Sequence, residues 1–355
     1  YAAIHFHEDD LYDCAWETDF SFTVPTNLRS GIYAAKLIDE QDNEEMIPFF
    51  VTAKQGKPQS RICVLIPSFT YTVYANIARG NTNKKMLERI KEWSASPWTT
   101  DNFPQFGLST YNYHSDGSGI SSSSRRRPIL TMRSNVISYP GVPGSGCRHF
   151  PADSHLWYWL TTKGYEFDVI TDDELHKYGL AAIEKYSVVV TCSHPEYHTP
   201  QSLNALQEYT NTGGHLMYLG GNGFYWKVAV SDVWPDAVEI RRGEGGIRAW
   251  ASEPGEYYNA FDGEYGGLWR RNGRAPQVLA GVGFTSQGDH YGAPYRRTPE
   301  SYSNEWAWVF EGITEEIIGD FGLSGGGAAG FELDRADTML GTLKCCNFGK
   351  FRGAR

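Results

Sequence analysis

The sequence predicts an α/β fold, in which a doubly wound, mostly parallel sheet follows the end of a β-sandwich. Between residues 57 and 220, runs of β-branched residues alternate with helical segments, which is the order of βαβ units. The runs 62–66 and 188–190 are apolar along their whole length, as in strands covered on both faces. Before residue 57, short runs instead alternate apolar and polar positions and are broken by Pro25 and by Ser30-Gly31. That pattern is typical of β-sandwich strands.

The individual elements follow from these patterns. Thr199 followed by Pro200 predicts the start of a helix, because a Thr N-cap and a Pro in the first turn are common start signals. Asp153 or Ser154 is the expected cap of an earlier helix. Strands are expected at 20–24, 32–38, 46–51, 62–66, 167–170, 187–191 and 215–219, with candidate strands at 278–284 and 306–310, and helices at 83–93, 153–162, 172–176 and 199–209.

The same patterns divide the chain into three parts. Residues 1–56 are expected to form the end of an immunoglobulin-like β-sandwich domain, residues 57–342 an α/β domain, and residues 343–355 an irregular tail. The chain starts without Met and inside a β-pattern, so we expect a further β-domain to precede it. The run Gly325-Gly-Gly-Ala-Ala-Gly330 is interpreted as a connector, because it lacks the Lys-Ser/Thr ending of a phosphate loop.

Composition restricts the function classes. The formal net charge of −10 and the pI near 5.5 argue against nucleic-acid binding, which needs a basic surface. No apolar run reaches about 18 residues, so no membrane span is expected. The six cysteines show no Cys-x-x-Cys spacing, and Cys345 and Cys346 are adjacent. This usage is typical of a reducing compartment and predicts a cytoplasmic protein.

Aromatic residues make up 14% of the chain, more than we expect one core of this size to need. Three segments are therefore interpreted as contacts with partner chains, since interfaces are enriched in aromatic residues and Arg. The alternative is that they pack within the domain. The segments are Arg125-Arg126-Arg127, Trp157-Tyr-Trp159 and residues 302–310.

Polar or aromatic side chains follow three predicted strands at the point where each strand ends. Because the carboxyl ends of strands in an open α/β sheet form the ligand-binding edge, these loops are expected to line one crevice. The middle loop offers two imidazoles and a carboxylate, which indicates a metal site or acid–base chemistry; an ordinary polar loop is the alternative. The loops are 68–76, which is rich in Tyr, 192–199 with His194, Glu196 and His198, and 220–226 with Asn222.

Two further polar segments are candidates. Segment 108–119 is too polar and glycine-rich for a core element and is interpreted as an ordered loop that turns toward the crevice. Hydrogen-bonded scaffolding is the alternative for its side chains Tyr111, Tyr113, His114 and Asp116. The segment His5-Phe-His-Glu-Asp-Asp10 is interpreted as a solvated capping turn rather than a metal cluster.

Three kinds of function remain open on these residues. Cys192 follows a strand, as a nucleophile would, but the flanking sequence lacks the glycines that a nucleophile elbow needs. A metal site is the stronger hypothesis, because Glu196 supplies a carboxylate and the tyrosines could supply phenolates, for which ferric iron is the ordinary metal. The third possibility is a non-catalytic binding module of a larger assembly.

Long segments of the sequence resemble the large subunits of the N,N-dimethylformamidase family. The resemblance implies an enzyme that hydrolyses N,N-dimethylformamide with water, giving dimethylamine and formate. It also implies a mononuclear Fe³⁺ held by two Tyr and one Glu. It also implies a flavodoxin-like, glutamine-amidotransferase-like core without the cysteine nucleophile, paired with a small helical subunit and a second large subunit. The segments that carry the resemblance are 5–10, 48–51, 70–76, 109–112, 115–119, 148–153, 193–198 and 219–226, and it fades after about Asp337.

The family's functional residues map onto positions in these segments. Glu196, in His-Pro-Glu-Tyr, is implied as the carboxylate ligand. Tyr111 is implied as one phenolate, in preference to Tyr113, and either Tyr71 or Tyr74 as the other. The resemblance further implies three residues that act on the substrate: His194 and Glu332 as an acid–base pair, and Asn222 as a polar group beside the substrate.

Overall fold

A computed structural model describes most of the chain. The described residues are 7, 9–78, 84–96, 100–137, 146–243, 249–287, 292–321, 327–330 and 332–334. The predicted tail at 343–355 and the first part of the glycine run at 325–330 lie outside them. The three-part division of the chain stays a prediction.

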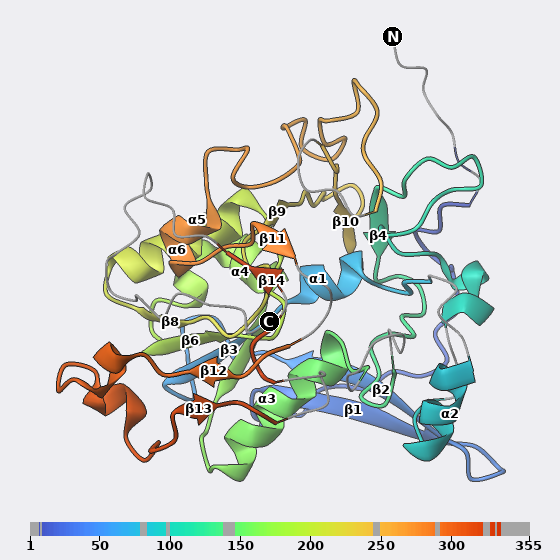
Figure 1. Ribbon diagram of the computed structural model, residues 1–355. Helices are drawn as coiled ribbons and strands as arrows, with labels where there is room; N and C mark the ends of the chain where they lie inside the picture. Colours follow the sequence, from blue (N-terminus) through green and yellow to red (C-terminus); the bar gives the residue numbers. More distant parts are fainter. Residues whose placement is uncertain are drawn as a thin grey trace.

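The centre of the fold is a four-stranded parallel sheet, which confirms the predicted mixed α/β class. Its strands are β3 (Ile62–Ile66), β5 (Asp168–Thr171), β6 (Val188–Thr191) and β8 (His215–Met217), in the order β5-β3-β6-β8 (Figure 1). All four match predicted strands. The apolar, β-branched runs form central strands because both of their faces are buried.

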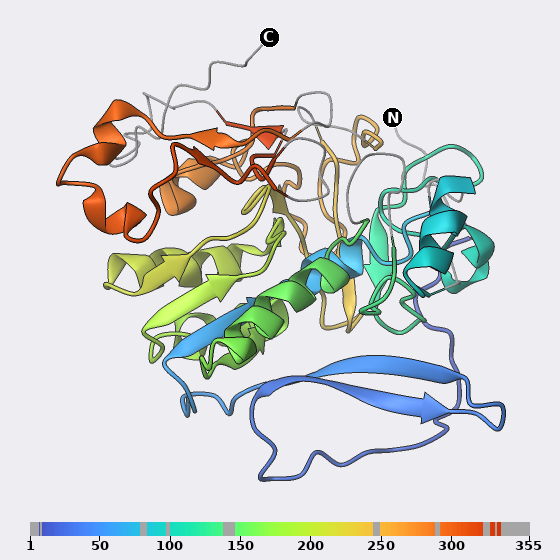
Figure 2. The same ribbon diagram turned by 60° about the horizontal axis from the view of Figure 1, so that its bottom comes forward.

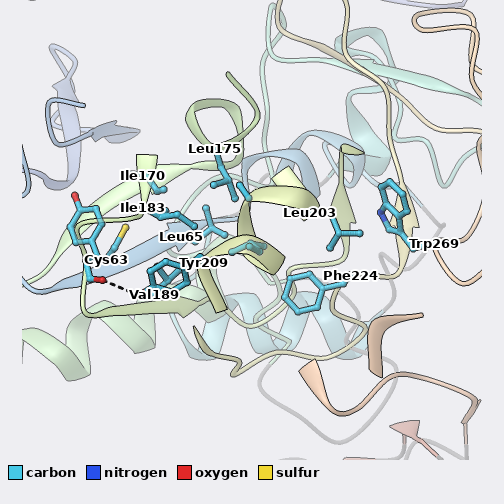
Figure 3. Close-up of a cluster of buried hydrophobic side chains, with 13 residues drawn as sticks. Cys63, Leu65, Ile170, Leu175, Ile183, Val189, Leu203, Tyr209, Phe224 and Trp269 are labelled. Carbon is cyan, nitrogen blue, oxygen red and sulfur yellow. Dashed lines mark hydrogen bonds between the residues drawn. The ribbon is translucent and has the colours of Figure 1, made fainter. Parts of the chain in front are cut away.

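Side chains of β3 alternate between two cores, one on each face of the sheet. Cys63 and Leu65 lie in a cluster with residues of α4 (Asp172–Tyr178) and α5 (Pro200–Asn211), as Figure 3 shows. Val64 and Ile66 pack on the opposite face against α3 (Phe150–Thr162). Each fully buried aliphatic side chain stabilises the fold by about 1.5–3 kcal/mol. Helices therefore cover both faces of the sheet (Figures 1 and 2).

The helix that follows β6 begins as predicted. Thr199 accepts a hydrogen bond from Ser202 N at 3.2 Å, and Pro200 occupies the first turn of α5. The predicted cap of α3 is wrong: the helix starts at Phe150, and His149 precedes it with φ 54°. Asp153 does not cap this helix because its carboxylate turns inward and accepts hydrogen bonds from two other segments.

The N-terminal part forms less structure than predicted. β1 (Gly31–Ile38) and β2 (Glu44–Val51) pair antiparallel as a hairpin that lies beside the α/β body (Figure 2). Residues 20–24, predicted as a strand, join no sheet in the described part of the chain. The backbone of these residues pairs with no other strand among the described residues. A β-sandwich is not confirmed.

Two predicted strands in the C-terminal part are wrong. Residues 278–284 overlap the short helix α6 (Pro276–Ala280), because Pro276 starts a helix and Gly281, at φ 72°, ends it. Residues 306–310 form a 3-10 turn, η5 (Ala307–Phe310), whose Phe310 ring lies against the Arg297 guanidinium. Apolar runs this short fit either a strand or a helix.

The remaining elements are short and surround the sheet. Four two-stranded sheets pair β4 with β10, β7 with β9, β11 with β14, and β12 with β13. No helix among the described residues is long and apolar enough to cross a membrane. The bounds are α1 (Ser68–Val73), α2 (Lys84–Glu92), η1 (Thr100–Asn102), η2 (Pro104–Phe106), β4 (Ser122–Ser124), η3 (Gly179–Ala182), β7 (Tyr197–His198), β9 (Trp226–Lys227), β10 (Ala237–Glu239), β11 (Ser286–Gln287), β12 (Tyr295–Arg296), η4 (Pro299–Tyr302), β13 (Ile317–Ile318) and β14 (Glu332–Leu333).

Candidate active site

The three predicted loops meet at the carboxyl edge of the sheet. The Thr70 hydroxyl, on α1 after β3, donates to the backbone oxygen of His194 at 2.9 Å. From the loop after β8, Gly221 N donates to Ser193 O at 2.9 Å, and Tyr225 N donates to Glu196 O at 3.0 Å. The loop after β6 is thus held by backbone contacts on both sides. The predicted convergence of the three loops is confirmed.

A carboxylate and two phenols form the centre of this site. The Tyr74 hydroxyl donates to Oε2 of Glu196 at 3.0 Å, and the Tyr74 and Tyr111 rings stack with centroids 4.2 Å apart. The Tyr111 hydroxyl shares a 2.5 Å hydrogen bond with the Tyr197 hydroxyl. All four side chains are buried. The loop that carries Tyr111 is tied to α1 through the Ser109 hydroxyl, which donates to Val73 O at 2.8 Å.

His194 lies at the open side of this centre. Its Nε2 is 2.9 Å from Oε2 of Glu196, and its side chain keeps 13% of its surface exposed. Glu332, on β14, lies close to the same position beside Gly221. A Cβ placed on Gly221 would be 3.7 Å from Nδ1 of His194 and 3.6 Å from Oε2 of Glu332. The predicted acid–base pair therefore faces one small space that a glycine leaves open.

Burial and charge set the protonation of the central groups. Burial raises the pKa of Tyr74 well above its usual value, and the charge of Glu196 raises it further; the same two causes raise the pKa of Tyr111. Burial also acts to raise the pKa of Glu196, but His194 and Arg242 outweigh it, so this pKa is lowered. The Arg242 guanidinium lies 4.1 Å from the Tyr111 ring centroid. These shifts favour a carboxylate anion at Glu196 beside two neutral phenols.

The donor set fits a hard, highly charged metal ion. One carboxylate and two phenol oxygens are the ligand types that ferric iron accepts. One further polar atom nearby on the chain, Oδ1 of Asn222 in the loop after β8, is buried without a hydrogen-bond partner among the described residues. Such atoms are rare in native structures and mark places where an ion, water or ligand belongs. A cation would also offset the cost of ionising buried phenols.

Tyr71 and Tyr113 lie away from the carboxylate–phenol centre. The Tyr71 hydroxyl donates to Oδ2 of Asp153 at 2.5 Å, in the core that includes Phe150. Tyr113 is half exposed, and its hydroxyl donates to Ala249 O at 2.6 Å. Of the tyrosines considered as metal ligands, the structure brings only Tyr74 and Tyr111 together beside Glu196.

Two other residues of the central loop are structural. Cys192 is fully buried in the core under α3, and burial, with the Asp153 charge, raises the pKa of its thiol well above the ordinary range. A nucleophilic cysteine needs an accessible thiolate, so this environment argues against Cys192. His198 is also buried, with its ring nitrogens contacting Pro195 O at 3.1 Å and the Ser202 hydroxyl at 3.3 Å.

Sequence reasoning missed several residues that shape the site. The ring centroids of His149 and Tyr74 are 4.0 Å apart. The Arg242 guanidinium packs against the rings of both Tyr111 and Trp226. Asp153 links Tyr71 to the backbone N–H of Ser193, next to His194. The segment 148–153 stood out in the sequence and could have indicated His149. Arg242 lies in an irregular stretch with no periodic signal.

The fold and the site define an α/β protein with a buried carboxylate–phenol centre at the carboxyl edge of its sheet. The chain belongs to the family described as N,N-dimethylformamidase beta subunit-like, C-terminal, which it matches over residues 1–345. It is 41% identical over 357 residues to an N,N-dimethylformamidase beta subunit of Alcaligenes sp and 40% identical over 347 residues to that of Paracoccus aminophilus. Each match covers 96% of this chain but only 45% of the relative.

Proposed function

We propose that this chain carries the active centre of an amide hydrolase that converts N,N-dimethylformamide, or a related small formamide, and water into an amine and formate. The observation that carries the proposal is the buried group of Tyr74, Tyr111 and Glu196 with His194 at its open side. The names of the two relatives, which are dimethylformamidase subunits, support it. Strand order β5-β3-β6-β8 supports a flavodoxin-like, glutamine-amidotransferase-like core.

Ferric iron is the cofactor that this donor set suits, with Tyr74, Tyr111 and Glu196 as the residues that would hold it. When bound, it supplies a Lewis acid for the amide carbonyl or an acidified water. Because the pKa of both phenols is raised in the metal-free protein, their protons must leave when the ion enters. Iron uptake should therefore release protons.

The chain's own residues supply the proton transfers and the pocket. Hydrolysis adds water to the carbonyl carbon and breaks the C–N bond, so one water proton must reach the leaving amine. His194 and Glu332 face the same space beside Gly221 and can take and return that proton. Dimethylformamide has no N–H donor, so recognition depends on its carbonyl oxygen and on apolar contacts, which the neighbouring aromatic rings provide.

Partner chains are part of the proposal. Both relatives are called beta subunits, which supports an enzyme of several subunits. We expect a small helical subunit and a second copy of this chain, because soluble assemblies are usually closed and symmetric. A cytoplasmic location fits the absence of disulfides among the described cysteines.

The test is amine release from dimethylformamide by the purified complex, with and without an iron chelator. We expect release that the chelator abolishes and added iron restores, and a visible absorption band from tyrosinate bound to iron. Glu196→Gln should lose both iron and activity, whereas Cys192→Ala should keep them. Active protein that contains no iron, or activity blocked only by thiol reagents, would contradict the proposal. No turnover of any small amide would favour a binding module.

A further inference from the structure

A second group of metal-binding side chains lies outside the candidate active site. It consists of His7 and Asp10 near the N-terminus and His114 in loop 113–119. One nitrogen of each histidine and a carboxylate oxygen of Asp10 all lie within 4.8 Å of one another. Segment 5–10 alone predicts a capping turn. The structure adds His114, about a hundred residues away, which no sequence spacing connects to it.

Hydrogen bonding fixes which nitrogen of His114 carries a proton. Its Nδ1 lies 2.7 Å from Oδ1 of Asp9. A carboxylate only accepts hydrogen bonds, so the Nδ1–H donates and the lone pair of the neutral ring is on Nε2. That nitrogen faces Oδ1 of Asp10 at 3.7 Å. Asp9 is held in place in turn, because its Oδ2 accepts from Ser115 N at 2.9 Å.

The same reasoning fixes His7. Its Nε2 lies 2.8 Å from the Ser118 hydroxyl. That hydroxyl already donates to Asp116 at 2.6 Å, so it must accept from His7, and the ring proton is on Nε2. The lone pair of the neutral ring is then on Nδ1, which faces Oδ2 of Asp10 at 4.0 Å. Two imidazole lone pairs therefore face the oxygens of one carboxylate.

We propose that His7 Nδ1, His114 Nε2 and the Asp10 carboxylate bind a divalent transition-metal ion such as Zn²⁺, with water completing the shell. Imidazole and carboxylate are the ligands that such ions take. Both histidines donate their other N–H to a carboxylate or a hydroxyl, which is the usual outer-shell arrangement of metal-bound histidine. The separations of 3.7 and 4.0 Å must shorten toward about 3.4 Å, the spacing of ligands around tetrahedral zinc.

Binding requires one local movement. The two imidazole rings stack with centroids 3.6 Å apart and planes 7° apart, so their lone pairs lie in two nearly parallel planes. One ion can accept both only if the rings tilt apart. His114 is buried and held by Asp9, whereas the side chain of His7 is only partly buried. The tilt is therefore assigned to His7.

The ion would tie the N-terminal segment to the loop that carries Tyr111. Cys14 N donates to Arg126 O at 3.0 Å, so this segment already runs beside that part of the chain. Within the loop, His114 N donates to Ser118 O at 2.8 Å, and Ile120 N donates to Asn112 O at 3.2 Å. A metal bridge at His114 would restrain the loop three residues from Tyr111. The site is structural in this role and takes no part in hydrolysis.

The test uses Co²⁺ as a spectroscopic probe in the Glu196→Gln variant of the complex, in which the active-site donor set is incomplete. After chelator treatment, Co²⁺ is titrated while its visible d–d absorption is recorded, and Zn²⁺ is then added as competitor. We expect one Co²⁺ per chain, displaced by Zn²⁺. His7→Ala and Asp10→Asn should each weaken binding by at least about tenfold, while circular dichroism shows an unchanged fold.

The matched control is His155→Ala, which removes an exposed histidine on α3 outside the cluster and should leave Co²⁺ binding unchanged. Absence of stoichiometric Co²⁺ binding in the Glu196→Gln variant would overturn the proposal. Binding that survives both His7→Ala and Asp10→Asn would overturn it as well. Either result leaves the amide hydrolase proposal intact, because that proposal is tested separately by iron content and amine release.

Discussion

At the scale of single residues, the clearest result concerns two tyrosines on one short segment. Tyr71 and Tyr74 are three residues apart, and the sequence offers no reason to choose between them. The structure separates them by the partners of their hydroxyl groups. Tyr71 points from α1 to Asp153, and Tyr74, just beyond its end, points to Glu196. Which carboxylate each hydroxyl reaches depends on distant segments, and local spacing does not contain that information.

This difference predicts opposite results for two matched variants. Tyr74→Phe should lose iron and nearly all amine release, because it removes one of the three oxygen donors. Tyr71→Phe should retain iron and most activity. It should lower the free energy of unfolding by about 1–3 kcal/mol, since Asp153 loses a buried hydrogen-bond donor. Iron analysis, amine release and urea unfolding measure these effects. Iron loss in Tyr71→Phe with retention in Tyr74→Phe would reverse the ligand assignment.

Gly221 gives a second prediction at this scale. A methyl group there would meet His194 and Glu332 at ordinary contact distances of 3.7 and 3.6 Å, so Gly221→Ala should fold normally. It would fill the space between the two proposed proton-transfer groups. We expect kcat/KM for dimethylformamide to fall by about 10- to 100-fold, the usual effect of one misplaced methyl group in a small pocket, with iron content unchanged.

The control for this variant is Gly330→Ala, whose new methyl group would have no atom of the described residues within 4 Å. It should behave as the unmodified protein. If Gly221→Ala has full activity on dimethylformamide, the substrate does not occupy the space beside Gly221. Loss of iron in Gly221→Ala would instead show that the change disturbs the metal centre.

At the scale of elements, prediction from sequence succeeded where a local signal and a tertiary role agree. The bounds of β3 and the first residue of α5 were predicted correctly, because a buried apolar strand and a Thr-Pro helix start are clear local signals. Residues 278–284 and 306–310 were predicted wrongly. Their apolar side chains fit both the period of a helix and the period of a strand. Their conformation depends instead on Pro276, Gly281 and the packing of Arg297.

The first turn of α4 leads to a prediction about how the free energy of unfolding depends on pH. Asp172 is buried and accepts a hydrogen bond from Phe69 N at 3.1 Å. Burial raises the pKa of Asp172 well above its usual value, and Asp173 raises it further. In the unfolded chain this carboxyl ionises near pH 4, so as pH rises above that value the unfolded state loses its proton first. The stability contributed by the protonated carboxyl is therefore lost as pH rises toward the folded-state pKa.

Asp172→Asn should remove this loss, because the amide has a similar shape, can still accept from Phe69 N and cannot ionise. Its free energy of unfolding relative to the unmodified protein should increase between pH 5 and pH 8. Urea unfolding at several pH values in this range measures the difference. Asp19→Asn, which makes the same change on an exposed side chain, is the control. A difference that does not vary with pH would show that Asp172 is ionised in the folded protein throughout.

At the scale of the whole molecule, the predicted partner surfaces divide into two kinds. The Arg125–Arg127 run, predicted as a partner contact, is used within the chain, because Arg125 pairs with Asp173 and Asp236 and Arg127 is buried. Charge alone could not show this, since the acidic partners come from distant segments. The aromatic segments are mixed. Trp157 packs against the core under α3, whereas Tyr158 is 70% exposed and Trp308 is 74% exposed.

The last prediction concerns assembly. The native mass of the purified active protein should exceed the 39.9 kDa of this chain and fit two copies of it together with smaller subunits. Oxidative footprinting should then show whether the assembly covers Tyr158 and Trp308. Aromatic side chains are enriched in interfaces relative to the rest of the protein surface. We therefore expect strong protection of at least one of the two in the complex and oxidation of both after dissociation. An active monomer with both side chains oxidised would show that catalysis needs no partner, and that the exposed aromatic residues serve another purpose.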